Sequence, residues 1–375
     1  MRVAIDVRPA SPDRVGGTAT YTAQLVRALL GTRPDLDYVL VTAEDTDPSL
    51  LHDATAAGAR TAQLGGRNLP RVQFGMPTLL RDNAVDVFHS PGSFLPLAWR
   101  GATVLTVHDL NVLTHPTRSL RPELVVRWLD QVSQTPASLL AARQLVAVSE
   151  ATAGSIRRLT PWLAPRVTVV PNAPDPFFDD PPTDAELNVA ADLAGNDLYI
   201  LAVGLLAPQK RVEVVVEAIA ALDYRERPNL LLVGKDPGSG WSHLATLAGR
   251  RGVLDCVRHV GVVPPGVLRA LYSGAEALVM ASDGEGFGLP VVEAMAAGTP
   301  VVAADRAALP EVLGGAGLLF DPDQVHTLIE PLRRLGREPG LREQLAAAGR
   351  ERRGAFSWDA TATATAEVYE AAARA

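Results

Sequence analysis

Cysteine is nearly absent from this sequence, because Cys256 is the only one among 375 residues. No internal disulfide can therefore form, and a zinc site built from thiolates is not expected. Basic residues are fewer than acidic ones: the sequence has 35 Lys and Arg and 42 Asp and Glu, which gives a formal net charge of -7. Because a general nucleic-acid-binding protein is usually basic, we expect no nucleic-acid partner.

Long hydrophobic runs are missing as well. No apolar segment approaches the ~18–20 residues that a membrane span requires. The first residues, Met1 and Arg2, lead straight into a strand-like segment at 3–7, without the apolar stretch and small-residue cleavage site of a secretory signal. We therefore predict a cytoplasmic protein with no transmembrane segment, and the sequence leaves peripheral membrane contact open.

The chain does contain 47% hydrophobic and 21% charged residues, the composition of a globular protein with packed cores. Its length exceeds that of one ordinary domain, so two domains are expected. Short apolar runs alternate with amphipathic stretches, which is typical of βαβ units and parallel sheets. The predicted strands fall in two series, at 2–7, 38–42, 85–88, 103–107, 144–148 and 167–170, and at 198–203, 229–233, 257–260, 277–280, 300–303 and 317–319.

The predicted helices alternate with these strands. In the first half they cover 18–30, 71–81, 122–142 and 150–159, and Pro136 is expected to kink or split the third. In the second half they cover 212–222, 241–251, 265–272, 290–297, 309–313 and 324–336, and one more helix follows at the end. A proline-rich, acidic stretch at 173–197 is typical of a linker. The sequence thus predicts two open α/β sheets in tandem, with the ligand site at the strand ends, in a cleft between the domains.

The segment 285–293, EGFGLPVVE, carries the strongest functional signal. Its glycines allow close approach of the backbone to a ligand, and Pro290 suits the first turn of the following helix. Such a helix start presents unpaired amides and a positive dipole end to a phosphate. Glu285 and Glu293 are too far apart to contact the same atoms, so they suit hydroxyl groups on two different sugars. The binding candidates here are Glu285, Gly286, Phe287, Gly288, Leu289 and Glu293.

A second candidate site lies at 203–211, directly after the first predicted strand of the second domain. Gly204 follows that strand, and Lys210 and Arg211 begin the next helix. A lysine beside the backbone amides of a helix start can anchor a phosphate. A solvated Lys-Arg pair at a helix start is a fair competing interpretation for Arg211.

Two weaker signals lie in the first domain. Gly16 and Gly17 separate its first strand from its first helix, although paired glycines mark turns in many proteins. His108 and Asp109 come just after the strand at 103–107, where the ligand sites of open sheets lie. An isolated histidine there could equally be satisfied by backbone groups of its loop.

Taken together, these segments resemble the retaining GT-B glycosyltransferases of glycosyltransferase family 4 (group 1), which includes mannosyltransferases and sucrose synthases. The resemblance implies that Glu285 contacts the hydroxyls of the donor sugar, that Glu293 binds the ribose of the nucleotide, and that His108 touches the donor sugar. Gly204 and Lys210 match the phosphate-binding residues of the family. Leu205 stands where many members have arginine, so Arg211 is the substitute candidate.

The same resemblance implies a role for each part of the chain. Residues 1–172 would form a Rossmann-like acceptor-side domain, and the backbone at Gly16 and Gly17 would meet the donor phosphate or the acceptor. Residues 173–197 would be the linker, and 198–356 a Rossmann-like domain that binds the nucleotide sugar. The last helix, 357–375, would pack back on the first domain.

The predicted reaction is retaining transfer of a hexose-type sugar from a nucleotide diphosphate sugar to a hydroxyl or amine acceptor. The segment 205–211 most resembles the mannosyltransferase-like branch, which favours GDP-mannose or a related manno-configured donor. Front-face transfer is implied, with His108, Glu285 and Lys210 as the catalytic set. The acceptor would be a small molecule, a glycan or a lipid-linked molecule.

No cofactor or metal is expected, since neither 179–180 nor 321–323 is placed to bridge a donor diphosphate through a metal. Asp321 and Asp323 are expected to cap the helix that follows them. Two alternatives stay open: a nucleotide-sugar epimerase on the same fold, and a non-catalytic protein that binds nucleotide or glycan. A dinucleotide oxidoreductase is disfavoured, because no Gly-x-Gly-x-x-Gly follows either first strand.

Overall fold

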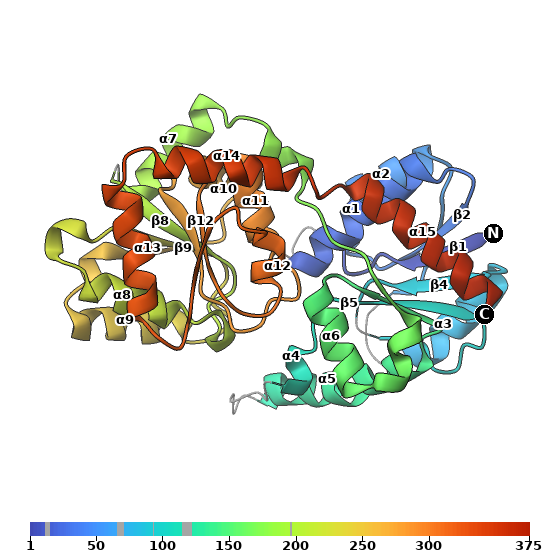
Figure 1. Cartoon of the computed structure of the whole chain (residues 1–375). Coiled ribbons are helices and arrows are strands. Elements are labelled where there is room, and N and C mark those ends of the chain that lie inside the picture. The colour runs from blue at the N-terminus through green and yellow to red at the C-terminus, as the bar shows by residue number, and fades with distance from the viewer. Residues whose placement is uncertain (12–15, 66–70, 93, 115–121, 196) are drawn as a thin grey trace. The chain divides into compact units, whose positions relative to one another are not determined.

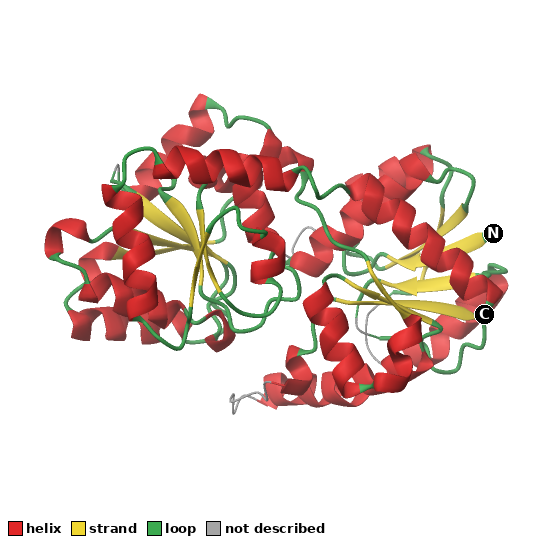
Figure 2. Ribbon diagram, viewed as in Figure 1, coloured by secondary structure: helices red, strands yellow, loops and turns green. Residues whose placement is uncertain are grey.

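The computed structural model describes residues 1–11, 16–65, 71–92, 94–114, 122–195 and 197–375. The chain divides into two compact units (Figure 1): unit 1 comprises Met1–Ala173 with Ser357–Ala375, and unit 2 comprises Pro174–Phe356. Each unit holds one parallel sheet flanked by helices, as Figure 2 shows by secondary structure. The predicted α/β class with two Rossmann-like sheets is therefore confirmed.

The sheet of unit 1 has seven strands in the order β3-β2-β1-β4-β5-β6-β7. Ile5 on β1 pairs with Leu40 on β2 and with His89 on β4, so the chain changes direction across the sheet between β1 and β4. Such a change of direction is where open sheets bind ligands. The strands are β1 Arg2–Asp6, β2 Asp37–Thr42, β3 Arg60–Gln63, β4 Val87–Ser90, β5 Ala102–Val107, β6 Gln144–Ala147 and β7 Val167–Val169.

Helices cover both faces of this sheet, with α1, α2 and α15 on one side and α3, α5 and α6 on the other (Figure 1). The C-terminal helix α15 packs along α1 and over β4, β5 and β6, so residues 357–375 belong to unit 1. The helices are α1 Gly17–Thr32, α2 Pro48–Ala56, α3 Met76–Asp82, α4 Asn111–Thr114, α5 Pro122–Ala141, α6 Glu150–Leu159 and α15 Trp358–Arg374; shorter turns are η1 Arg71–Gly75 and η2 Pro161–Arg166.

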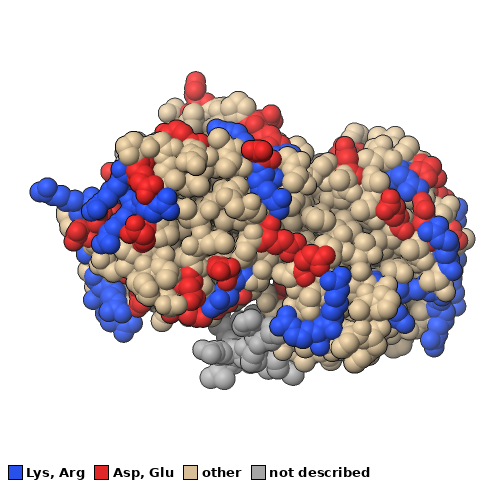
Figure 3. Space-filling view, in the orientation of Figure 1, with Lys and Arg blue, Asp and Glu red and all other residues tan. Residues whose placement is uncertain are grey.

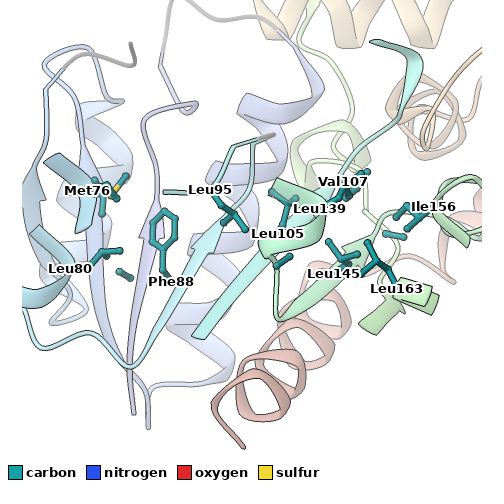
Figure 4. Packing of buried hydrophobic residues seen from close by; sticks show 14 of the residues in the cluster. Met76, Leu80, Phe88, Leu95, Leu105, Val107, Leu139, Leu145, Ile156 and Leu163 are labelled. Carbon is teal, nitrogen blue, oxygen red and sulfur yellow. The ribbon is translucent and has the colours of Figure 1, made fainter. Parts of the chain in front are cut away.

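The core under α3, α5 and α6 is made of buried hydrophobic side chains (Figure 4). Phe88 and Leu105 point from neighbouring strands into this layer, where Leu80 of α3 and Leu139 of α5 pack. Full burial of one such side chain contributes about 1.5–3 kcal/mol, so this layer holds the strands together. α5 runs through Pro136 as one helix, so of the expected kink or split, the split does not occur.

Unit 2 has a six-stranded sheet in the order β10-β9-β8-β11-β12-β13, with the change of direction between β8 and β11. The strands are β8 Tyr199–Val203, β9 Asn229–Val233, β10 Val257–Gly261, β11 Ala277–Met280, β12 Val301–Ala304 and β13 Leu318–Phe320. The helices are α7 Asp184–Ala194, α8 Val212–Ala221, α9 Gly240–Arg251, α10 Pro265–Gly274, α11 Leu289–Ala297, α12 Leu309–Leu313, α13 His326–Arg337 and α14 Leu341–Arg353. Short 3₁₀ turns are η3 Pro176–Asp179, η4 Pro208–Lys210, η5 Tyr224–Glu226 and η6 Leu254–Cys256.

The stretch that the sequence suggested as a linker is largely ordered within unit 2. Thr183 begins α7 with a capping box, in which its side chain accepts from the Glu186 amide and the Glu186 side chain accepts from the Thr183 amide. Arg269 of α10, itself buried, bonds the Glu186 carboxylate at 2.7 Å and lies over the Phe177 ring at 4.0 Å. These contacts attach α7 to α10, so this part of the chain packs as part of unit 2.

Surface charge and helix composition add two observations. On the face drawn in Figure 3, acidic and basic side chains are interspersed. Within the described ranges, none of the helices combines the length and the apolar character needed to cross a membrane.

Candidate functional site

Unit 2 brings the two strongest sequence motifs to one edge of its sheet. The segment 203–211 follows β8, and 285–293 follows β11, its neighbour across the change of direction. The carboxyl ends of strands at such a point diverge and leave a crevice for a ligand. A shallow pocket is found here, lined among others by Gly204, Lys210 and Ser282.

Glycines line up at the ends of the adjacent strands β8, β9 and β10. The Gly204 amide donates to the Val233 carbonyl at 2.9 Å, and the Gly234 amide donates to the Gly261 carbonyl at 2.8 Å. Gly204 has φ +142° and Gly234 has φ +146°, values that side-chain-bearing residues rarely adopt. A Cβ on Gly234 would lie 1.8 Å from the Gly204 carbonyl oxygen, so only glycine fits there. This edge of the sheet therefore presents backbone rather than side chains beside Lys210.

Lys210 and Glu285 form the centre of this site. The Lys210 ammonium donates a hydrogen bond to the Glu285 carboxylate, and 21% of the lysine and 14% of the glutamate side chain are exposed. The two loops that carry them are also joined through the backbone, because the Asp283 amide donates to the Gln209 carbonyl at 3.0 Å. A partly desolvated ion pair held by two fixed loops offers one cation and one carboxylate at the same place.

The turn after Glu285 leads into α11 through a left-handed glycine. Gly288 has φ +98°, a backbone conformation that side-chain-bearing residues rarely adopt, and a Cβ there would lie 2.9 Å from Leu309 Cδ2. Pro290 occupies the first turn of α11, and no side chain caps this helix start. The positive end of the α11 dipole is therefore directed at the turn that carries Glu285, which suits an anionic ligand.

Glu293 lies in α11 and is held by a different group. The Tyr272 hydroxyl of α10 donates to Glu293 Oε2 at 2.9 Å, and the Tyr272 ring packs edge-on against Phe178 with centroids 5.7 Å apart. Burial raises the pKa of Glu293 to about 7, the hydrogen bond from Tyr272 opposes this, and the charge of Asp175 adds to it. Glu293 therefore changes charge near neutral pH, unlike an ordinary glutamate.

Arg211 is occupied by carboxylates of unit 2. Its guanidinium donates to Asp283 at 3.0 Å, to Asp323 at 2.9 Å and to the Pro322 carbonyl at 2.9 Å. The hydrogen bond to Asp323 and the charge of Asp283 raise the pKa of Arg211, and burial opposes this. These bonds fix Arg211 to the loop after β13, where it supports the turn at Lys210.

The aspartates at 321–323 were expected to cap a helix, and this prediction is wrong. The residue that precedes α13 is Val325, and no side chain caps the helix. Asp321 bonds Arg306 at 3.2 Å and the Asp323 amide at 3.1 Å, while Asp323 bonds both Arg306 and Arg211. Charge pairing with two arginines therefore outweighs capping at this turn.

In unit 1, His108 lies just after β5, as the sequence suggested. Its Nε2 lies 2.8 Å from the Pro91 carbonyl oxygen, which can only accept, so Nε2 carries the hydrogen. Burial lowers the pKa of His108, although the hydrogen bond to Pro91 and the charge of Asp109 oppose this. The neutral ring in this tautomer keeps a lone pair on Nδ1, so His108 can accept a hydrogen bond there.

Gly16 and Gly17 stand at the start of α1. The Ala19 amide donates to the Gly16 carbonyl at 3.0 Å, and no side chain caps this helix. Among the described residues, no atom lies within 4 Å of a Cβ added at Gly16. Residues 12–15, which precede this pair, lie outside the described residues.

Comparison with known proteins decides the family. Residues 185–352 match the family described as Glycosyl transferases group 1, and residues 15–176 match Glycosyltransferase Family 4. The chain is 31% identical to O-antigen chain mannosyltransferase B of Escherichia coli over 297 residues, which cover 78% of this chain and 76% of the relative. It belongs to the family 4, group 1 glycosyltransferases.

Further relatives agree with this assignment. The glycosyltransferase is 34% identical to a D-inositol 3-phosphate glycosyltransferase of Actinosynnema mirum over 287 residues, which cover 72% of this chain and 67% of the relative. Its fold is similar to that of sucrose-phosphate synthase from Thermosynechococcus elongatus, with a TM-score of 0.75, 23% identity and 98% coverage of both chains. The predicted GT-B fold is thereby confirmed.

Three residues of the glycosyltransferase site were missed by sequence reasoning. Gly234 ends β9 as Gly204 ends β8, so its place at a strand end was a usable signal. Tyr272 lies at the end of the helix expected at 265–272, and only the structure shows its hydroxyl on Glu293. Asp283 precedes Glu285 by two residues, but its partner Arg211 is 72 residues away in sequence.

Proposed function

We propose that this glycosyltransferase transfers a hexose-type sugar from a nucleotide diphosphate sugar to a hydroxyl or amine acceptor with retention of anomeric configuration. The observation that carries the proposal is the contact between Lys210 and Glu285 at the carboxyl ends of β8 and β11. A lysine suits the diphosphate, and a carboxylate beside it suits the hydroxyls of the attached sugar. This contact supports placing the bond between the diphosphate and the sugar beside Lys210 and Glu285.

Each polar group then has a separate task. Lys210 and the start of α11 would stabilise the negative charge that grows on the leaving diphosphate. Glu285 would orient the hexose through its hydroxyls, and Glu293 would accept from the ribose hydroxyls while Tyr272 holds it. His108 of unit 1 would accept from a hydroxyl of the donor sugar.

The proposed step is front-face transfer. The bond from the anomeric carbon to the diphosphate oxygen breaks, and the acceptor oxygen or nitrogen forms a bond to that carbon on the same face. The proton of the acceptor passes to the departing diphosphate oxygen, so atoms and charge balance without a protein nucleophile. The protein contributes position and electrostatic stabilisation, which are large terms in enzyme catalysis.

For the donor we propose GDP-mannose or a related manno-configured nucleotide sugar. Support comes from the segment 205–211 and from the E. coli relative, which is named a mannosyltransferase. The acceptor would be a small molecule, a glycan or a lipid-linked molecule, and we propose that no metal or other cofactor takes part.

The deciding experiment compares nucleotide diphosphate sugars in two steps. Donors that bind only the folded protein raise its melting temperature, and those that do are incubated with and without acceptors. Product with retained anomeric configuration, read from the one-bond carbon–hydrogen coupling at the anomeric position, supports the proposal. An inverted product contradicts it. Product from donor alone would indicate an epimerase, and binding without any product would indicate a non-catalytic protein.

A further inference from the structure

A continuous chain of hydrogen bonds crosses the interior of unit 1. The Tyr369 hydroxyl of α15 lies 2.7 Å from His89 Nδ1, and His89 Nε2 lies 2.8 Å from Thr106 Oγ1. Thr106 Oγ1 in turn lies 3.0 Å from the Tyr21 hydroxyl of α1. All four side chains are at most 1% exposed, so none of these groups can exchange its partner for water.

This hydrogen-bond chain is complete only when all four side chains are present. Burial lowers the pKa of His89 to about 3, so its ring is neutral and donates from one nitrogen only. The two bonds at His89 therefore run in the same direction, because the ring donates from one nitrogen and accepts at the other. In the bond between Thr106 and Tyr21 either hydroxyl can be the donor. Removing one member leaves a buried polar group unsatisfied, which costs more than one ordinary hydrogen bond.

This chain ends against His108. The Tyr21 ring meets the His108 ring at 85° with centroids 4.9 Å apart, and on another side it meets Trp358 of α15 at 6.0 Å. His108 is thus held twice, by the Pro91 carbonyl at Nε2 and by Tyr21 at its ring. The first contact fixes the tautomer, and the second fixes the ring orientation.

We propose that Tyr21 is a positioning residue that holds the His108 ring so that Nδ1 accepts a hydroxyl of the donor sugar. Tyr369, His89 and Thr106 anchor Tyr21 from the opposite side, so the C-terminal helix supports the histidine through this chain. The inference rests on the proposed function for the role of His108. It adds residues from α1, β4, β5 and α15 that no sequence motif singled out as one set.

The first test is a double-mutant cycle on the whole 375-residue protein. We expect Tyr21→Phe to lower kcat for transfer by about tenfold, since it keeps the ring but removes its anchor, while the Kd for GDP stays unchanged. In a His108→Ala background, Tyr21→Phe should cause no further loss. Equal losses in both backgrounds would overturn the proposal, because they would show that Tyr21 acts without His108.

Matched variants separate positioning from general stability. Tyr38 is a further buried tyrosine of unit 1, and its hydroxyl donates to the Arg33 carbonyl at 3.1 Å, which is not part of the hydrogen-bond chain. Tyr38→Phe should leave kcat unchanged. Thr106→Ser keeps the central hydroxyl and should retain activity, whereas Thr106→Val should lower kcat as Tyr21→Phe does. Loss of kcat in Thr106→Ser equal to that in Thr106→Val would contradict the proposal.

A second readout does not depend on turnover. In protein with ¹⁵N- and ¹³C-labelled histidine, His108 should give one sharp set of ring signals with hydrogen on Nε2. Tyr21→Phe and Tyr369→Phe should broaden or shift these signals, and Tyr38→Phe should not. Unchanged His108 signals in both Tyr21→Phe and Tyr369→Phe would overturn the positioning role of Tyr21. Absence of transfer with every nucleotide sugar would instead count against the proposed function, and the ring signals would still decide this inference.

Discussion

Lys210 donates its hydrogen bond to Glu285, so the cation proposed for the diphosphate and the carboxylate proposed for the sugar are bonded to one another. A phosphate that approaches Lys210 must compete with this carboxylate. A complete nucleotide sugar can satisfy both groups, because it carries a phosphate for the lysine and hydroxyls for the glutamate. A nucleoside diphosphate without sugar can satisfy only the lysine.

This relationship predicts opposite effects of Glu285→Gln on binding and on transfer. Removing the carboxylate charge leaves the Lys210 ammonium free for phosphate, so we expect GDP to bind several-fold more tightly. Transfer should fall by about 100-fold or more, because the sugar loses its orienting carboxylate. Calorimetry and a turnover assay measure the two effects. Glu217→Gln, which removes a carboxylate paired with Arg251 on the surface, is the control. Weaker GDP binding in Glu285→Gln would show that the ion pair does not compete with phosphate.

Lys210 and Arg211 are adjacent in sequence, but their different bonding partners predict different effects of substitution on GDP binding and on stability. Lys210→Ala should weaken GDP binding by about tenfold to 100-fold and abolish transfer, since a charge-assisted bond to phosphate is lost. Arg211→Ala should change the GDP affinity only a few-fold, because Asp283 and Asp323 already hold the guanidinium. It should instead lower the free energy of unfolding by about 1–2 kcal/mol, because the hydrogen bonds to Asp283, Asp323 and the Pro322 carbonyl are lost. A GDP affinity reduced equally in both variants would restore Arg211 as a phosphate ligand.

The sheets were predictable because strands of parallel sheets are buried on both faces. The runs at 38–42, 103–107 and 277–280 are almost entirely apolar or β-branched, and each became a strand within one or two residues of its expected bounds. β3 was missed because Arg60–Gln63 is a short edge strand with exposed side chains, which carries no apolar signal. α14 was missed because Leu341–Arg353 buries only a narrow stripe among many charged residues.

The site was predictable only as far as its groups are local in sequence. Gly204, Lys210 and Glu285 stand in short motifs beside strand ends, so the pattern alone placed them. The partners that set their properties come from elsewhere: Tyr272 lies 21 residues from Glu293, and Asp323 lies 112 residues from Arg211. Burial is equally invisible in a motif, so the raised pKa of Glu293 could not be foreseen from the residue type.

Metal removal should leave transfer unchanged. The proposed catalysis assigns the diphosphate charge to Lys210 and to the start of α11, which require no cation. Among the residues that the structure describes, no group of three or more His, Cys, Asp or Glu is placed to hold a metal ion. We expect equal kcat/KM in excess EDTA and in millimolar Mg²⁺ after dialysis. Activity that EDTA abolishes and Mg²⁺ restores would contradict the metal-independent step.

Nucleotide binding should depend on pH through Glu293. Burial raises the pKa of this carboxyl to about 7, so below that pH it is mostly protonated. An ionised carboxylate accepts from both ribose hydroxyls, whereas the protonated form is a poorer acceptor. The GDP affinity should therefore rise with pH up to about pH 7, by at most about tenfold per unit, and level off above it. Glu293→Gln should bind more weakly and without this pH dependence, and calorimetry between pH 5.5 and 8.5 measures both. A wild-type affinity that is flat across this range would contradict the assignment.

The titration of Glu293 should also make the stability of the ligand-free protein depend on pH. In the unfolded chain Glu293 ionises with an ordinary pKa near 4.5, whereas the folded chain retains the proton until about pH 7. The proton bound by the folded state stabilises it fully below the unfolded pKa, and this contribution is lost as pH rises through the folded pKa. Glu293→Gln cannot ionise and keeps an oxygen for the Tyr272 hydroxyl. The free energy of unfolding of Glu293→Gln should therefore rise relative to that of the wild type between pH 5 and pH 8. Urea denaturation at each pH measures this difference. Parallel curves for the two proteins would mean that the folded carboxyl titrates like an exposed glutamate, and the pH dependence of binding would then need another group.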